Sequence, residues 1–168
     1  MDRETYMGNT LDLKINEHGK KNTGNSNKES IFLDKIIDKL DFYCKCAKLP
    51  KVIKYATQFR LEIGRIDLIV QHENNKYSIW EAKYENERKA GEIELYFVKG
   101  IAQLLSYRTV LVLTESIDIR NIDLILVVNK DCTWIPSILN LNKIDCTLLC
   151  IAENEIKGYK YWGIKSNE

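Results

Sequence analysis

The 168-residue sequence has almost no net charge, because its 25 lysines and arginines nearly balance its 24 aspartates and glutamates. No field of one sign marks the whole surface for nucleic acid, so any such binding must use a local basic patch. No apolar run approaches the roughly 20 residues that a membrane helix needs. The segment MDRETYMGNT lacks the apolar region of a signal peptide, so we expect an intracellular, cytoplasmic protein without membrane association.

Histidine is also scarce, and the cysteines lack the usual metal-binding spacings. Neither His18 nor His72 has neighbours typical of catalysis, which disfavours acid–base chemistry based on histidine. An odd number of cysteines in an intracellular protein indicates reduced thiols. Their Cys-x-Cys and Cys-xxx-Cys spacings fit zinc and iron–sulfur patterns poorly, so we expect small core residues. The five are Cys44, Cys46, Cys132, Cys146 and Cys150.

The length suits one domain preceded by a polar segment. Residues 1–27 end in HGKKNTGNSNK and show no periodic apolar pattern, so we expect a flexible N-terminal arm. Residues 28–168 are then expected to form a single domain. Ser26 or Asn27 can cap a helix over about 28–46, in which the apolar residues fall on one arc.

Strand-like and helix-like runs alternate in the rest of the chain. Strands are expected over 55–71, with a bend at Gly64, and over 76–84, 122–129 and 146–152; helices over 92–113 and 138–142. The segment HENN joins the first two runs as a hairpin. The resulting order, α-β-β-β-α-β-α-β, predicts an α/β protein with a mixed sheet flanked by helices.

Charged residues interrupt two of the expected strands. Asp67 is a lone carboxylate in GRIDLIV, and IWEAKY carries Glu81 and Lys83 two positions apart, hence on one face of a strand. Buried charge is costly unless it is paired or binds a metal. One interpretation is structural, with a Glu81–Lys83 ion pair on an edge strand and Asp67 paired with Arg60 or Arg65. The other is that these residues form a site.

The length of the hairpin loop distinguishes the two interpretations. A three-residue loop of Glu73, Asn74 and Asn75 places Asp67 opposite Glu81, on the same face of the sheet. A two-residue loop at Asn74-Asn75 would turn Asp67 to the other face. A shared site therefore requires an odd loop or a β-bulge, and we predict one.

Polar residues also lie beside the apolar faces of two expected helices. Glu29 falls within the apolar arc of the first helix, although a glutamate in a first turn is also favoured by the helix dipole. Gln103 and Tyr107 are one turn apart on the helix over 92–113, with Lys99 a turn earlier on the same stripe.

Taken in order, Asp67, the tripeptide Glu81-Ala82-Lys83 and the pair Gln103/Tyr107 resemble the PD-(D/E)XK nuclease superfamily, in its RecB-type branch with a QxxxY motif. The resemblance covers about residues 29–107. Glu29 lies where many members carry a glutamate on the first helix, and Ile66 stands where the proline of the motif's name would be. The resemblance implies a restriction-endonuclease-like core.

It also implies a nuclease that depends on Mg²⁺ or Mn²⁺. Asp67, Glu81, the Ala82 carbonyl and Glu29 would hold the metal, and Lys83 would orient or deprotonate water or stabilise phosphate charge. Gln103 and Tyr107 would line the site and hold substrate phosphate or the metal. The same residues are thus the expected catalytic group.

DNA is the substrate that the resemblance implies, cleaved to leave 5′-phosphate ends. A homodimer fits this, because cutting two strands takes two sites. Three alternatives stay open: an RNase on the same scaffold, a non-catalytic nucleic-acid-binding or assembly protein, and a nuclease subunit of a larger defence, repair or mobile-element complex.

Overall fold

A six-stranded mixed sheet forms the centre of the computed structural model, which describes residues 10–18, 27–152 and 155–162. Strand β2 is antiparallel to both β1 and β3, strands β3, β4 and β5 are parallel to one another, and β6 returns antiparallel to β5. In their order across the sheet they are β1 (Val52–Leu61), β2 (Gly64–His72), β3 (Tyr77–Lys83), β4 (Ile122–Val128), β5 (Cys146–Ala152) and β6 (Glu155–Trp162).

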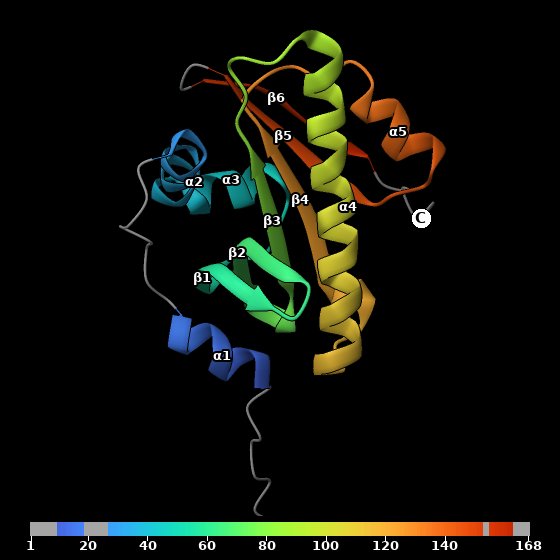
Figure 1. The fold of residues 1–168 in the computed structure, drawn as a ribbon. Coiled ribbons are helices and arrows are strands. Elements are labelled where there is room, and N and C mark those ends of the chain that lie inside the picture. The colour runs from blue at the N-terminus through green and yellow to red at the C-terminus, as the bar shows by residue number, and fades with distance from the viewer. Residues whose placement is uncertain (1–9, 19–26, 153–154, 163–168) are drawn as a thin grey trace, which may run out of the picture.

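Helices cover both faces of this sheet (Figure 1). On one face, α2 (Lys28–Asp38) and α3 (Leu40–Cys46) bury an apolar cluster that includes Trp80 and Ala82 of β3. On the other face, α4 (Ala90–Glu115) and α5 (Ile135–Leu141) pack over a cluster that includes Tyr77 and Ile79. Side chains alternate along β3, so the odd-numbered positions 77–83 face α4.

The α-β-β-β-α-β-α-β order over residues 28–152 is confirmed, and the fold is α/β with the element order of a restriction-endonuclease-like core. Asn27 caps α2, where its side chain accepts a 2.7 Å hydrogen bond from the Ser30 N–H. The single helix expected over 28–46 is divided, because the backbone of Lys39 (φ −123°, ψ 29°) leaves the helical region.

The predicted odd loop is also confirmed. His72 donates its backbone N–H to the Lys76 carbonyl at 2.8 Å, and residues 73–75 form the three-residue loop between them. Asn74 and Asn75 adopt φ values of 63° and 55°, a left-handed conformation that asparagine tolerates better than most residues. Because Leu68 lies opposite Trp80 in this register, the next positions along the two strands place Asp67 opposite Glu81.

The expected flexible arm is wrong for residues 10–18, which form helix α1 (Thr10–His18). Leu11 and Ile15 are fully buried in the cluster that contains α4. Their spacing of four gives one apolar face only two residues wide, too short a pattern to be distinguished from a polar segment. Residues 1–9 and 19–26 lie outside the described part of the chain.

Two other features differ from expectation. Strand β6 was not predicted, and it places β5 inside the sheet. Strand β3 is central, between β2 and β4, so Glu81 and Lys83 do not lie on an edge strand. None of the helices that the structure describes is long and apolar enough to span a membrane.

Candidate active site

Strands β2 and β3 bring the three strand-borne charged residues together on the face covered by α4. Lys83 Nζ lies 2.5 Å from Glu81 Oε1, and both side chains are at least 94% buried. The pair foreseen in the structural interpretation therefore forms, but in the interior of the sheet. An ion pair at such a depth is costly to desolvate and is weak evidence for stability alone.

Asp67 is held at the edge of this pair by neutral donors. Its Oδ2 accepts the Ala82 backbone N–H at 2.9 Å, and its Oδ1 accepts Gln58 Nε2 at 3.3 Å. Gln58 has φ 51°, in the left-handed region that side-chain-bearing residues seldom occupy. Strain of this kind persists where the surroundings impose it, and here it accompanies a contact to Asp67.

Burial and the charge of neighbouring carboxylates raise the pKa values of both carboxyl groups. Burial, followed by the charge of Asp67, raises the pKa of Glu81 to about 7, against the lowering effect of Lys83. Burial also raises the pKa of Asp67, while the Ala82 N–H and Lys83 oppose that rise and Glu29 adds to it. One ammonium group therefore does not fully compensate the acidic side chains around it.

Glu81 also has an unsatisfied atom. Its Oε2 is buried and has no hydrogen-bond partner in the described structure. Such atoms are rare in native proteins and need an explanation, and the binding of an ion or a water molecule is one. Carboxylate oxygens suit a hard divalent cation, so the donor chemistry of Asp67 and Glu81 fits Mg²⁺ or Mn²⁺.

The geometry does not yet form a complete cation site. Within the described residues, no three side chains of His, Cys, Asp or Glu are grouped so that they could hold a metal ion. Glu81 is directed to Lys83, and Asp67 to Ala82 and Gln58. Cation binding would require these carboxylates to exchange their present partners, and the roles of Glu29 and the Ala82 carbonyl as ligands stay predictions.

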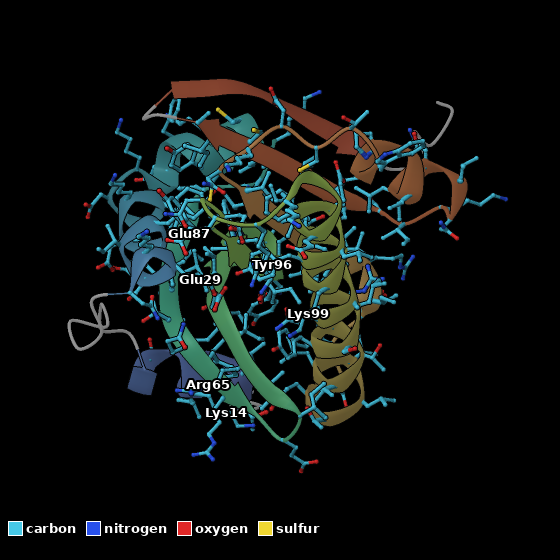
Figure 2. All side chains as sticks on the ribbon, turned by 45° about the horizontal axis from the view of Figure 1, so that its top comes forward. Lys14, Glu29, Arg65, Glu87, Tyr96 and Lys99 are labelled. Atoms are coloured by element: carbon cyan, nitrogen blue, oxygen red, sulfur yellow. The ribbon has the colours of Figure 1, made fainter. Side chains whose placement is uncertain are left out.

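Glu29 is connected to α4 by a residue that the sequence pattern did not reveal. The Tyr96 hydroxyl donates a hydrogen bond to Glu29 Oε2, and Figure 2 shows the two side by side between α2 and α4. Burial, then this hydrogen bond and the Glu29 charge, raise the pKa of Tyr96. The Tyr96 ring also lies 5.2 Å from Lys83 Nζ and 3.9 Å from the Arg88 guanidinium carbon. Tyr96 thus links Glu29 to both cations.

Helix α4 approaches β3 closely at Gly100. A Cβ atom there would lie 2.7 Å from Leu126 Cδ1 and 3.4 Å from two carbons of Lys83. Tyr96, Gly100 and Gln103 follow one stripe of α4, with spacings of four and three. That stripe was the available signal for Tyr96, because it extends the predicted Gln103/Tyr107 pair by two turns.

Gln103 and Tyr107 lie farther along this stripe. Gln103 Nε2 is 3.4 Å from the Tyr107 hydroxyl, and Gln103 Oε1 is buried without a hydrogen-bond partner in the described structure. The Tyr107 hydroxyl is 3.0 Å from where a Cβ on Gly64 would lie, so the ring packs against the start of β2. Lys99 is exposed on α4 (Figure 2). The hydrogen bond of the pair therefore joins the two residues to each other, not to the carboxylates.

Two hollows give access to the acidic group. One, of about 220 Å³, is lined by Asp67, Glu29, Gln58 and Arg65; the other, of about 410 Å³, is lined by Glu29, Tyr96, Arg88 and the segment 84–87. Glu29 borders both. Asp67 and Glu29 can therefore be reached from solvent, and Glu81 and Lys83 lie buried behind them.

No protein-family model and no curated protein matches the chain. Among solved structures, a repair endonuclease from Pyrococcus abyssi is similar at 16% identity and a TM-score of 0.46, covering 69% of this chain and 44% of that one. EndoMS in complex with double-stranded DNA is similar at 14% identity and a TM-score of 0.42, covering 63% of this chain and 39% of that one. The chain thus spans less than half the length of either protein, and both likenesses are distant.

Proposed function

We propose that the protein is a divalent-metal-dependent nuclease that hydrolyses phosphodiester bonds, with DNA as its substrate. The observation that carries the proposal is the register of the β2–β3 hairpin, which places Asp67 opposite Glu81 with Lys83 beside it. A loop with an odd number of residues is needed for a shared site and is not needed for an isolated Glu81–Lys83 pair. The buried, unpartnered Glu81 Oε2 and the raised pKa values of both carboxyl groups support the same assignment.

Asp67 and Glu81 would hold the metal, Mg²⁺ or Mn²⁺, with Glu29 and the Ala82 carbonyl as further oxygen donors. Bound there, the metal would supply charge stabilisation at the phosphate and a more acidic water. Lys83 Nζ donates a hydrogen bond to Glu81 at 2.5 Å and would donate another to a phosphate oxygen or to the attacking water. Arg65 and Arg88 line the two hollows and would orient the phosphates.

Gln103 and Tyr107 would act as the QxxxY pair of a RecB-type nuclease. Their position supports a role in shaping the wall of the site, because Tyr107 packs on Gly64 at the start of β2 and fixes the strand that carries Asp67. The orphaned Gln103 Oε1 is an acceptor that a substrate or a bound water would satisfy.

A second candidate is a non-catalytic nucleic-acid-binding protein on the same scaffold. The closed, buried Lys83–Glu81 pair favours it, as does the lack of a three-ligand group within the described residues. In that case the charged residues would be structural, and substitution of Asp67 would leave nucleic-acid binding unchanged.

A cleavage assay with matched variants separates the two candidates. Linear, circular and single-stranded DNA and RNA are incubated with wild-type protein in Mg²⁺, Mn²⁺ or EDTA, alongside Asp67→Asn, Lys83→Met and the exposed control Glu62→Gln. We expect metal-dependent cleavage of DNA that both site variants lose and the control keeps. Cleavage in EDTA, or cleavage that survives both site substitutions, would refute the proposal. Binding without cleavage under every condition would support the non-catalytic candidate.

A further inference from the structure

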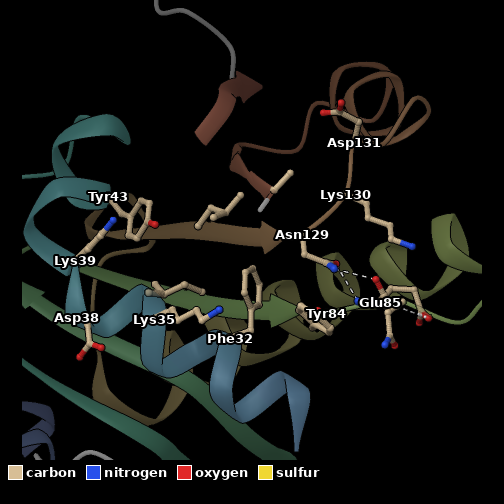
Figure 3. A pocket seen from close by; sticks show the side chains of 14 residues that line it. Phe32, Lys35, Asp38, Lys39, Tyr43, Tyr84, Glu85, Asn129, Lys130 and Asp131 are labelled. Carbon is tan, nitrogen blue, oxygen red and sulfur yellow. Dashed lines mark hydrogen bonds between the residues drawn. The ribbon is translucent and has the colours of Figure 1, made fainter. Parts of the chain in front are cut away.

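A third and larger hollow, of about 600 Å³, opens beyond the carboxyl ends of the parallel strands β3, β4 and β5, on the face covered by α2 and α3 (Figure 3). Its lining combines three aromatic residues with three lysines. They are Phe32, Tyr43, Tyr84, Lys35, Lys39 and Lys130. The volume lies in the range of about 300–1,000 Å³ that is typical of ligand pockets, and ligands of α/β sheets often bind at this end of the strands.

The aromatic residues provide apolar surface in a partly enclosed space. Phe32 and Tyr43 are each 5% exposed, so they are fixed in the cluster below the hollow. The ring of Tyr84 packs on Phe32 with centroids 5.5 Å apart and an interplanar angle of 56°, and it stays half-buried. Rigid rings of this kind provide stacking surfaces for nucleobases.

The lysines supply positive charge that no carboxylate takes up. None of Lys35, Lys39 and Lys130 forms an ion pair within the described part of the chain. Lys35 lies on α2, and Lys39 lies one turn later, directly after the end of that helix. Lys130 follows β4, on the other side of the hollow. Ammonium groups on two sides of an aromatic floor suit a ligand that carries both a phosphate and a flat ring.

Three carboxylates also border the hollow: Glu85, Asp131 and Asp38. Glu85 Oε1 accepts the backbone N–H groups of residues 86, 87 and 88 at 2.7–2.8 Å, and its Oε2 pairs with Arg88. Asp131 accepts a hydrogen bond from Cys150 Sγ at 3.4 Å. Asp38 is directed away from the centre of the hollow in Figure 3. Both oxygens of Glu85 thus have donors within the protein, whereas the three lysines form no ion pair among the described residues.

The rim between this hollow and the candidate active site is fixed. Asn129 accepts the Glu85 backbone N–H and donates to the Glu85 carbonyl, both at 2.8 Å, so β4 holds the segment that follows β3. Tyr84, Glu85 and Asn86 line both the 600 Å³ hollow and the 410 Å³ hollow that contains Glu29. The two hollows thus share a wall immediately after Lys83.

We propose that the 600 Å³ hollow binds one unpaired nucleotide of a nucleic-acid strand whose neighbouring phosphate lies at the candidate active site. The base would stack on Tyr84, and Lys35, Lys39 and Lys130 would bind the flanking phosphates. The inference rests on the proposed function for the position of the cut, and it specifies the substrate class: single-stranded nucleic acid, or a duplex with an unpaired or readily extruded base. A fully paired base does not expose its faces, and extruding it costs energy.

Binding is measured in EDTA, so that no cleavage is needed. The probes carry the fluorescent base 2-aminopurine in a single strand, in a duplex with one unpaired nucleotide, and in a fully paired duplex. The test variant is Lys35→Ala/Lys39→Ala. The control, Lys45→Ala/Lys51→Ala, removes the same charge from exposed positions outside the hollow. Tyr84→Leu tests stacking, and thermal unfolding confirms that each variant is folded.

We expect wild-type protein and the control to bind the first two probes more tightly than the paired duplex. The Lys35/Lys39 variant should bind single strand about tenfold more weakly, with a salt dependence reduced by about 1.4 in the log–log slope for two lost phosphate contacts. Tyr84→Leu should lose the quenching of 2-aminopurine and weaken binding about fivefold or more. Free mononucleotide should compete only weakly.

Equal binding by the two double-lysine variants would overturn the inference. Equal binding of paired and unpaired probes would also do so, and so would competition by a free mononucleotide as strong as that by the oligonucleotide. The result is independent of the nuclease assignment. If binding depends on the lysines but no cleavage occurs in Mg²⁺, the nucleotide pocket is supported and the nuclease proposal is rejected. If cleavage depends on metal but binding does not depend on the lysines, the nuclease proposal is supported and the nucleotide pocket is rejected.

Discussion

Lys83 Nζ and Glu81 Oε1 are 2.5 Å apart inside the central strand of the sheet, and neither side chain is more than 6% exposed. Each residue stabilises the other, because either one alone would be an unpaired charge in the interior of the protein. Glu81 still keeps one unsatisfied oxygen and a pKa raised to about 7 by burial and by Asp67. Lys83 therefore does not fully balance the negative charge around it, and this imbalance has measurable consequences.

Replacing Lys83 alone should destabilise the protein strongly. In Lys83→Met, Glu81 loses the ammonium group that donates a hydrogen bond to it, and breaking a buried pair on one side costs about 3–5 kcal/mol. We expect this loss in urea unfolding at pH 8.5, and a smaller one at pH 5.5, where Glu81 is protonated. The double variant Glu81→Gln/Lys83→Met should recover much of the stability. An equal loss at both pH values would contradict this account.

The pH dependence of stability follows from the raised pKa of Glu81. Its carboxyl group binds a proton more tightly in the folded protein than in the unfolded chain, where its ordinary pKa is 4.5. The free energy of unfolding should therefore fall as the pH rises from about 4.5 to about 7, by about 2–3 kcal/mol from this residue. Glu81→Gln should flatten this part of the profile, and the exposed control Glu62→Gln should retain it. Identical profiles for Glu81→Gln and wild type would show that Glu81 does not titrate in this range.

The hairpin that forms the site could be predicted from the sequence because its determinants are local. Asn74 and Asn75 tolerate the left-handed conformation that a three-residue loop requires, and the length of that loop sets the pairing register and hence the face that Asp67 occupies. The cap at Asn27 is local in the same way. The element order over residues 28–152 follows from such signals.

The contacts around the site could not be predicted, because they depend on tertiary packing. Tyr96 meets Glu29 across 67 positions of sequence, and Gln58 reaches Asp67 only because its own backbone is in the left-handed region. Helix α1 is short, and Leu11 and Ile15 are its only buried apolar residues, so its stability comes from the surface it covers. The central position of β3 likewise depends on parallel pairing with β4, which no local pattern reveals.

Gly100 should control how closely α4 approaches Lys83. In Gly100→Ala, the added methyl group would lie 2.7 Å from Leu126 Cδ1, and Leu126 is fully buried. We expect a loss of about 1–3 kcal/mol in the free energy of unfolding, and lower activity if the protein cleaves nucleic acid. Gly91→Ala is a matched control on the same helix, with no heavy atom within 4 Å of the added Cβ; it should be neutral or slightly stabilising. Equal effects of the two substitutions would show that α4 can shift to accommodate the methyl group.

Divalent metal should bind in competition with protons. If Asp67 and Glu81 take up Mn²⁺, the metal must displace the proton that the raised pKa of Glu81 favours, so binding should be strong at pH 8 and weak at pH 5.5. Calorimetric titration and thermal unfolding report the same event, since a ligand at 100 times its Kd stabilises by about 2.7 kcal/mol. Asp67→Asn and Glu81→Gln should each abolish the stabilisation, and Glu62→Gln should keep it. Stabilisation by Mn²⁺ that is the same in all three variants, or the same at both pH values, would place the metal elsewhere on the protein and remove the basis for a two-carboxylate site.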